Sequence, residues 1–429
     1  MYLSPFPLSP SLWFATAEPA PQTEPLHQNH HCDVAVIGGG FAGLSTALHL
    51  AKRKINTTLL EAREIGFGAS GRNGGQVIPG LKYDPDDMIK KFGAERGQEL
   101  IRFAGGTANS VFDLIAQHNM NVPFVRKGWI QGAHSDTALG TAHKRAEQWQ
   151  RYGAPVRFLD QSQTQRLLGT ERYLGGWVDE RAGAVQPLSY IRGLATAAIQ
   201  AGAKIHTDSP VKSLSLQNGK WQINTDSGAS ITADRVVMCT NAYGGDLWPK
   251  LKTSIIDANS FQIATNPLPD HIRQTILPQG HVSSDTRNLL LYFRLDHEGR
   301  LLMGGRGPFR EPKGDADWAH LERVLHKMFP QVKGQDIAYR WCGRVAITRD
   351  YLPHLHEPAP GLLIDIGCMG RGVGLQTSMG IAMAEYIANG DKLSLPFTIT
   401  EAKSFPLYGL RRLYVNAVVT WYRINDGGL

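Results

Sequence analysis

The segment Cys32–Glu61, CDVAVIGGGFAGLSTALHLAKRKINTTLLE, constrains the fold more than any other part of the chain. Its apolar residues predict a buried strand at 34–37, a helix through 44–51 and a second strand at 57–60. The glycine pattern G-x-G-x-x-G stands between the first strand and the helix. In this context the pattern is typical of a βαβ unit that binds the pyrophosphate of a dinucleotide at the helix N-terminus.

Each glycine of this motif has its own physical task. Gly38 permits the tight turn after the strand, Gly40 lets the backbone approach a pyrophosphate, and Gly43 lets the helix pack closely on the strand. Glu61, at the end of the second strand, is placed to accept hydrogen bonds from an adenosine ribose. A lone glycine motif is often an ordinary turn, but here strand, helix and acid all follow in register. The unit leaves NAD and FAD as open alternatives, since both dinucleotides use it.

Length and composition restrict what else the chain can be. A chain of 429 residues exceeds one ordinary core, so we expect two domains. The net charge of +7 comes from scattered lysines and arginines, and without a focused basic patch no nucleic-acid partner is expected. The four cysteines have no C-x-x-C spacing, so neither a metal site nor a disulfide framework is expected. No apolar run predicts a transmembrane segment and no signal peptide is evident, so the cytoplasm is the expected compartment.

Strand patterns that belong with the βαβ unit recur near residues 204, 234 and 362, far away in the sequence. We therefore expect a mixed α/β (α+β) fold, in which a Rossmann-like domain is interleaved with an antiparallel-sheet substrate domain. The expected boundaries are an N-terminal arm at 1–31, a cofactor-binding domain at 32–82, 186–250 and 336–395, a substrate domain at 83–185 and 251–335, and a C-terminal tail at 396–429.

Three further segments favour a flavin over a nicotinamide. GASGRNGGQ at 68–76 offers hydroxyl, guanidinium and amide donors to a planar cofactor with phosphates, although a mobile surface loop is the alternative interpretation. TNAY at 240–243 follows a strand at the sheet edge where α/β folds bind ligands. GCMGRGVGL at 367–375 is a glycine-rich turn before a helix, and its amides suit the negative charge of a reduced flavin.

These three segments resemble those that contact the flavin in the D-amino-acid oxidase family of FAD enzymes. The stretch WCGRVAITRDYLP at 341–353 is similar to the W-x-G-x-x-x-x-T-x-D-x-x-P pattern of that family. The resemblance extends from about residue 10 to residue 395 and implies a fold like that of glycine and sarcosine oxidases. Within the family, SLWFATA at 11–17, YFR at 292–294 and LLMGGR at 301–306 are most similar to gamma-glutamylputrescine oxidase-like members.

The resemblance implies FAD as the cofactor, and with it a set of contact residues. The expected FAD-binding residues are Gly38, Gly40, Phe41, Ala42, Gly43, Glu61, Ala62, Ser70, Arg72, Asn73, Gly74, Gly75, Gln76, Val211, Thr240, Asn241, Gly370, Arg371, Gly372 and Val373. Val211 would pair its backbone with the adenine, Thr240 and Asn241 would lie near the pyrophosphate, and the last four residues near the flavin pyrimidine. Some relatives tether the flavin to a cysteine before the T-x-D stretch. Cys342 falls one position from that site, so we expect non-covalent FAD.

The chemistry of the family implies an amine-oxidising enzyme. A hydride equivalent passes from a C–H bond beside nitrogen to the flavin, the imine hydrolyses to an aldehyde or keto product plus ammonia, and O2 is reduced to H2O2. An FAD dehydrogenase with another electron acceptor and a non-catalytic flavoprotein remain as alternatives, and the oligomeric state is open.

The residues expected on the substrate side of the flavin come from two stretches of sequence. Tyr292 and Arg294 share a strand face, and Arg294 is expected to bind a substrate carboxylate; the alternatives are a solvated strand face or an ion pair. The candidate catalytic residues are Tyr292, Arg294, Trp341, Arg344 and His281.

Overall fold

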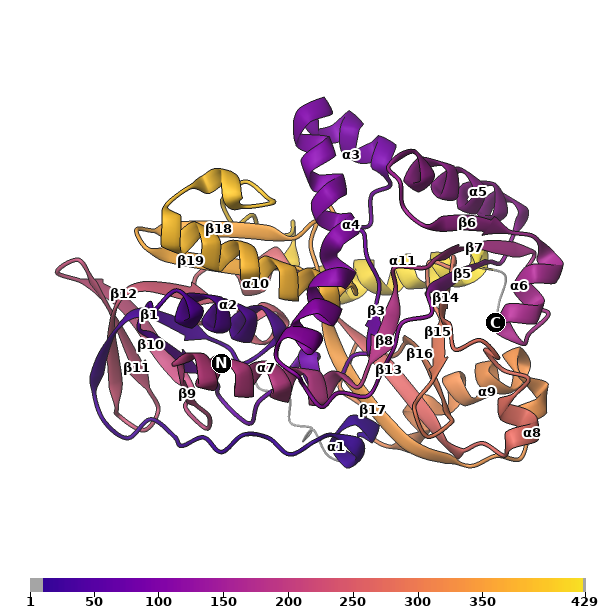
Figure 1. The fold of residues 1–429 in the computed structure, drawn as a ribbon, viewed down its shortest axis with the longest axis horizontal. Coiled ribbons are helices and arrows are strands. Elements are labelled where there is room, and N and C mark those ends of the chain that lie inside the picture. Colours follow the sequence, from indigo (N-terminus) through magenta and orange to yellow (C-terminus); the bar gives the residue numbers. More distant parts are fainter. Residues whose placement is uncertain (1–10, 427–429) are drawn as a thin grey trace.

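The computed structural model describes residues 11–426, which form two large sheets with helices packed on and between them (Figure 1). The first sheet, on the left in Figure 1, contains the glycine-motif βαβ unit. Beyond its main path, β18 (His354–Ala359) pairs with β19 (Leu362–Ile366), which in turn pairs with β12. The strands of the main path are, in spatial order, β10 (Val211–Gln217), β11 (Lys220–Thr225), β12 (Ser230–Met238), β1 (His30–Ile37), β2 (Thr57–Leu60) and β9 (Lys204–His206).

The centre of this sheet is buried on both faces. Strand β1 runs parallel to both β2 and β12, and its residues alternate between two apolar cores. Val34 and Val36 share a core with residues of three helices, while Ala35 and Ile37 share a core with the β10–β11 hairpin. Burial on both faces explains why the strand is a continuous apolar run rather than an alternating one. The three helices are α2 (Phe41–Lys52), α7 (Pro187–Ala201) and α10 (Gly372–Asn389).

Helices α2 and α10 start at the same edge of the sheet. Strands β1 and β19 both run parallel to β12, and each is followed directly by one of these helices. A close crossing fixes their positions, because a Cβ atom on Gly380 would lie 2.6 Å from the Ala42 carbonyl oxygen. Ser45 also donates a hydrogen bond of 2.8 Å to the Thr377 carbonyl across this crossing. Two helix N-termini are thereby brought to one place.

The second sheet, on the right in Figure 1, is antiparallel except where β5 lies parallel to β14. Its strands are, in spatial order, β17 (Ile337–Ile347), β13 (Ile256–Pro267), β16 (Arg300–Arg306), β15 (Tyr292–Leu295), β14 (Val282–Asp285), β5 (Trp129–Ala133), β7 (Gly175–Asp179) and β6 (Val156–Leu159). A small sheet of β3 (Gln76–Val77), β8 (Gly183–Val185) and β4 (Phe124–Val125) lies between the two large ones. The remaining helices in this region are α3 (Pro85–Phe92), α4 (Ala94–Gln117), α5 (Asp136–Arg151), α6 (Gln161–Leu168), α8 (Asp270–Arg273) and α9 (Ala319–Met328).

The mixed α/β fold with interleaved sheets is confirmed, but one segment lies elsewhere than expected. Strand β17 pairs with β13 from Ile337 to Ile347, so this stretch belongs to the second sheet and not to the cofactor-binding one. A short connection at 348–353 leads from β17 to β18, and no turn pattern in the sequence marks the change of sheet.

The expected arm contains helix α1 (Leu12–Thr16), with residues 1–10 outside the described part. The expected tail contains helix α11 (Arg411–Asn425).

Candidate functional site

Two adjoining cavities open where β1, β12 and β19 end. The smaller one, of about 80 Å³, lies at the glycine motif and is called here the glycine cavity. The larger one, of about 310 Å³, lies between the two sheets and is called the large cavity. They are neighbours, since five residues line both of them: Phe41, Ala69, Ser70, Asn241 and Gln376.

The glycine cavity has room because its glycines carry no side chains. Gly38 has a φ of +109°, and a Cβ atom on Gly43 would lie only 1.9 Å from the Gly38 carbonyl oxygen. A Cβ atom on Gly40 would lie 3.0 Å from the Ser70 hydroxyl oxygen. That hydroxyl accepts a hydrogen bond of 3.0 Å from the Phe41 amide at the start of α2. An unsubstituted backbone at a helix N-terminus is the cradle that a pyrophosphate needs.

Glu61 closes the far end of the glycine cavity. Its carboxylate accepts hydrogen bonds from the Gly39 amide at 2.6 Å and from the Arg63 amide at 3.0 Å. Burial raises the pKa of Glu61, and these amides work against that rise. The Ser209 amide donates to the Glu61 backbone carbonyl, so the segment that leads into β10 at Val211 lies beside the end of β2. The geometry fits an adenosine ribose on Glu61.

The loop at 68–76 is tied down rather than mobile. Asn73 donates to the Ser70 carbonyl at 2.7 Å and accepts a hydrogen bond of 2.8 Å from the Gly75 amide. The buried Arg72 donates through Nε to the Phe67 carbonyl at 2.8 Å. Gln76 reaches across to the second sheet and donates to the Ser283 carbonyl at 2.9 Å. The loop is therefore a fixed wall of the large cavity.

The opposite wall is formed by the turns that follow β12 and β19. The Gly367 amide donates to the Asn241 side-chain oxygen at 3.1 Å, which joins the two turns. Met369 and Gly370 both have positive φ, and helix α10 begins at Gly372 with its first amides at the cavity. The Arg371 guanidinium donates to the Pro79 carbonyl at 2.6 Å, and burial lowers its pKa to about 10.

Most residues expected to bind FAD line these two cavities. The four that do not are Gly43, Ala62, Gly75 and Val211. Gly43 acts indirectly, because its missing side chain allows the turn at Gly38. Since two adjoining cavities with shared lining residues extend from Glu61 to the start of α10, the residues present fit an extended dinucleotide.

Of the five candidate catalytic residues, Tyr292 and Arg344 line the large cavity. The Tyr292 hydroxyl lies 2.9 Å from the Ser260 hydroxyl, and burial raises its pKa. Its ring packs against Gly74, where a Cβ atom would lie 2.8 Å from the ring. The Arg344 guanidinium pairs with Glu311. Tyr292 and Arg344 are thus the two candidates that the structure places at the large cavity.

Arg294 differs from the expectation that it binds a substrate carboxylate. It is buried outside the large cavity, where Nε donates to the Gly74 carbonyl and Nη2 to the Val185 carbonyl, both at 2.9 Å. Its guanidinium also lies over the Trp13 ring, 4.9 Å from the centroid. Burial lowers its pKa to about 10. Arg294 therefore positions the loop wall rather than the substrate.

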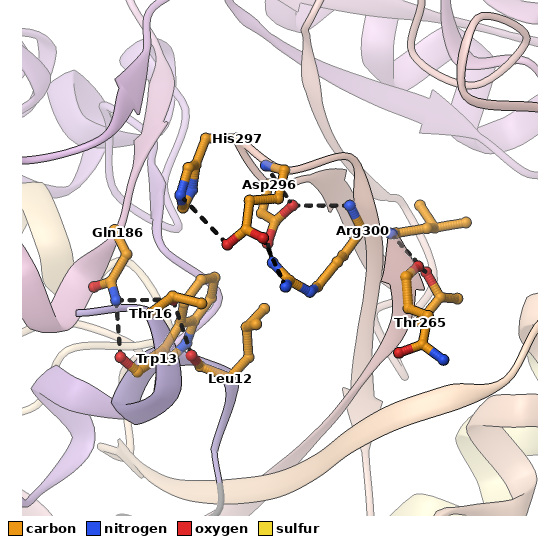
Figure 2. Close-up of polar contacts among 11 residues, drawn as sticks. Leu12, Trp13, Thr16, Gln186, Thr265, Asp296, His297 and Arg300 are labelled. Atoms are coloured by element: carbon orange, nitrogen blue, oxygen red, sulfur yellow. Dashed lines mark hydrogen bonds and ion pairs between the residues drawn. The ribbon is translucent and has the colours of Figure 1, made fainter. Parts of the chain in front are cut away.

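Trp341 likewise lies outside the large cavity and contacts residues of its wall. Its indole donates to the Arg72 carbonyl at 3.0 Å and meets the Trp13 ring edge-on. Trp13 in turn donates to the Asn73 carbonyl at 2.6 Å. Figure 2 shows how α1 is fixed: Gln186 donates to the Trp13 carbonyl at 2.8 Å. Sequence reasoning missed Trp13, although Ser11 caps its helix in the usual way.

His281 lies apart from the flavin segments. It lines a separate cavity of about 440 Å³, together with Trp13, Arg294 and the turn around His297, which Figure 2 shows beside α1. Within the described part of the chain its Nδ1 has no hydrogen-bond partner, and burial lowers its pKa. The structure does not bring His281 to the large cavity.

Two cations in the large cavity were not predicted. Arg306 ends β16, and among residues 11–426 no hydrogen bond or ion pair engages its guanidinium. Lys82 lines the cavity, and desolvation, with help from Arg371 and Arg145, lowers its pKa to about 8. LLMGGR contributed to the family resemblance, but nothing in it marked Arg306 as a ligand-binding residue, and no pattern marked Lys82.

The charged side chains that line the large cavity are all cations. No aspartate or glutamate is found among its described lining residues. Its cations are Arg72, Lys82, Arg306, Arg344 and Arg371. Such a space favours anionic groups, as a dinucleotide and a carboxylate would provide.

Other kinds of site find no support in residues 11–426. No group of three or more histidines, cysteines, aspartates or glutamates there is arranged to hold a metal ion. None of the helices in that range is both long and apolar enough to cross a bilayer.

The βαβ cradle, the fixed flavin-side loops and the second sheet that closes the cavity define an FAD-dependent oxidoreductase. The chain belongs to the DAO family, FAD dependent oxidoreductases, whose family profile matches residues 33–386. The predicted membership and cofactor are thus confirmed.

Relatives agree with this membership. The chain is 31% identical to gamma-glutamylputrescine oxidoreductase of Escherichia coli, over 88% of each chain. It is also 31% identical to the probable oxidoreductase OrdL of Haemophilus influenzae, over 94% of each chain. Among solved structures, glycine oxidase of Geobacillus kaustophilus superposes with a TM-score of 0.73 at 19% identity, covering 87% of this chain and 100% of that one.

Proposed function

We propose that this oxidoreductase oxidises the C–N bond of an amine that also carries a carboxylate, with gamma-glutamylputrescine as the best candidate, and passes the electrons to O2. The observation that carries the proposal is the Arg306 guanidinium, which faces the large cavity without a protein partner among residues 11–426. A half-buried cation of this kind binds a carboxylate well, because the pairing replaces water that the guanidinium has partly lost. The substrate named in the Escherichia coli relative has such a carboxylate at one end and an amine at the other.

The same charge pattern prepares the amine for oxidation. A C–H bond beside nitrogen gives up hydride only when the nitrogen is a neutral amine with a free lone pair. Several cations and no carboxylate around a bound ammonium lower its pKa, so proton loss to solvent becomes easier. No dedicated base is then required, in agreement with the absence of a carboxylate from the described lining.

Bound FAD would supply the electron acceptor for this hydride equivalent. Glu61, the glycine motif and the α2 N-terminus would hold its adenosine and pyrophosphate, while the amides at the start of α10 would face the pyrimidine. Tyr292 and the loop at 68–76 would position the substrate between flavin and second sheet. The imine formed from the substrate then hydrolyses to an aldehyde and ammonia.

Lys82 supports the choice of O2 as the final acceptor. A cation that lines the cavity favours the transfer of negative charge to O2.

We also propose that FAD is held without a covalent bond, because Cys342 packs in the apolar core of the second sheet and not at the cavity. We propose the cytoplasm as the compartment, since Cys32, Cys239, Cys342 and Cys368 are all unpaired.

The test compares gamma-glutamylputrescine with putrescine, which lacks the carboxylate, in a peroxide-release assay. In Arg306→Met, the KM for gamma-glutamylputrescine should rise about tenfold to a hundredfold, the loss expected for a charged hydrogen bond. The KM for putrescine should stay unchanged. Arg310→Met is the matched control, because Arg310 is exposed outside the large cavity and paired with Asp317. An equal loss for both amines would contradict the carboxylate assignment, and dye reduction without peroxide would show an acceptor other than O2.

A further inference from the structure

Helix α11 carries two apolar faces, and only one of them is covered by the protein. On the inner face, Val415, Val419 and Tyr422 are half-buried. The outer face repeats apolar residues at steps of three and four: Leu410, Leu413, Ala417, Trp421 and Ile424. This spacing places them on one stripe of the helix, opposite the inner face.

The outer stripe is unusually exposed for such residues. Leu413 is 68% exposed, Trp421 61% and Ile424 74%, and Leu407 before the helix is 75% exposed. A contiguous apolar stripe of this kind is rare on a soluble protein unless something covers it. The half-buried inner face and the hydrogen bonds that Asp426 accepts just after the helix connect α11 to the protein, so the outer face is available for a partner.

The charges beside the stripe identify the kind of partner. Residues 411–425 contain three arginines and no acidic residue, and the whole chain has a net charge of +7. Arg412 and Arg423 are both exposed and lie on one flank of the helix, between the inner face and the outer stripe. Their long side chains can reach phosphate groups while the stripe enters the lipid. Trp421 is an aromatic residue suited to the boundary between lipid and water.

We propose that α11 docks the protein on an anionic lipid bilayer, lying in the plane of the headgroups with its outer stripe in the acyl boundary. A short helix with an apolar face, flanking arginines and a tryptophan has the properties of an interfacial anchor. A second copy of the chain is a weaker candidate, since like-charged helices with three arginines each would repel one another.

Both ends of α11 lie near residues that line the cavities of the site. Asp426, directly after the helix, accepts hydrogen bonds from the amides of Asn288 at 3.0 Å and Leu289 at 2.8 Å. Both of these residues line the large cavity. At its other end, Arg411 and Arg412 line a neighbouring cavity that also includes Arg344. In Figure 1 the yellow helix runs from the first sheet toward the second. Docking through α11 therefore brings the rim of the large cavity to the bilayer.

The experiment is vesicle flotation with the FAD-loaded, full-length protein. Vesicles of phosphatidylglycerol with phosphatidylcholine are compared with pure phosphatidylcholine, at low and high salt. We expect the parent protein to float with the anionic vesicles, and added salt to weaken this binding. The double variant Leu413→Gln/Ile424→Gln should lower the bound-to-free ratio at least tenfold, because each side chain loses its transfer into lipid. Leu393→Gln is the matched control, as this leucine is 84% exposed outside α11.

A second variant keeps the test decisive if the first one misfolds. Arg412→Gln/Arg423→Gln leaves the stripe intact and should lower the ratio about fivefold for each arginine on anionic vesicles only. The proposal is overturned if the parent floats with neither vesicle, or if both double variants float like the parent. It is also overturned if the parent is a concentration-dependent dimer that Leu413→Gln/Ile424→Gln converts to a monomer, because a second copy would then cover the stripe.

Discussion

Asp365 offers a quantitative test of the electrostatics around the cavity. It lies on β19, just before the turn that leads to α10, and is 2% exposed. Its Oδ1 has no hydrogen-bond partner within residues 11–426. Burial raises the pKa of this carboxyl from 3.8 to about 7, with Gln376 opposing the shift in part. Asp365→Asn keeps the shape of the side chain and removes the charge.

The direction in which Asp365 changes stability with pH follows from the proton that its carboxyl binds. The folded state binds the Asp365 proton more tightly than the unfolded chain, so the carboxyl costs stability above pH 3.8, and the cost grows until about pH 7. A shift of about three pKa units corresponds to about 4 kcal/mol near pH 8, and to about 2 kcal/mol near pH 5. For a chain of 429 residues, removing this free-energy cost raises Tm by about 4 °C near pH 8 and by about half of that near pH 5.

Differential scanning calorimetry of the FAD-loaded protein at both pH values measures this effect. Asp365→Asn should raise Tm, more at the higher pH. Asp246→Asn, at a side chain that is 81% exposed, should leave Tm unchanged at both. An equal shift at the two pH values, or a loss of stability near pH 8, would refute the assignment of a buried, poorly solvated carboxylate.

Three further outcomes follow from the site. Gly43→Ala should weaken FAD binding by more than tenfold, because its Cβ would lie 1.9 Å from the Gly38 carbonyl oxygen; Gly106→Ala, which meets nothing within 4 Å, should keep the yellow colour. In Lys82→Met, the pH dependence of kcat/KM should lose a decline near pH 8, the range in which the parent's Lys82 loses its charge; an unchanged profile with full FAD loading would count against a role for this lysine. Acid precipitation should leave all FAD in the supernatant, whereas a yellow pellet would point to a covalent tether such as Cys342.

The cofactor half of the site was open to prediction because its residues stand in local patterns. The glycine motif, the loop at 68–76 and the turn at 367–375 each combine glycines with a strand or helix end, and the physics of a phosphate cradle is visible within a few residues. Their assembly into one cavity depends on α2 and α10 beginning at the same edge of the sheet, which the strand pairing of the folded protein shows.

The substrate half was harder for a physical reason. Arg294 contacts the loop at 68–76, and Arg306 lines the large cavity. Only three-dimensional contacts distinguish the roles of these two arginines. The first donates to two backbone carbonyls, while the second has no protein partner among residues 11–426. A strand face predicts which side chains lie together but not which of them is already satisfied. The change of sheet at β17 escaped prediction for the same reason, since pairing partners are far apart in sequence.

Anaerobic reduction of the bound flavin is the direct test of amine oxidation at this site. The holoenzyme is mixed without oxygen with gamma-glutamylputrescine, putrescine, sarcosine, glycine and D-amino acids, and the visible flavin absorption is followed. We expect rapid bleaching by an amine that carries a carboxylate, fastest with gamma-glutamylputrescine, and slow bleaching by putrescine. A flavin that no amine in this panel bleaches would contradict oxidation of a C–N bond at this site.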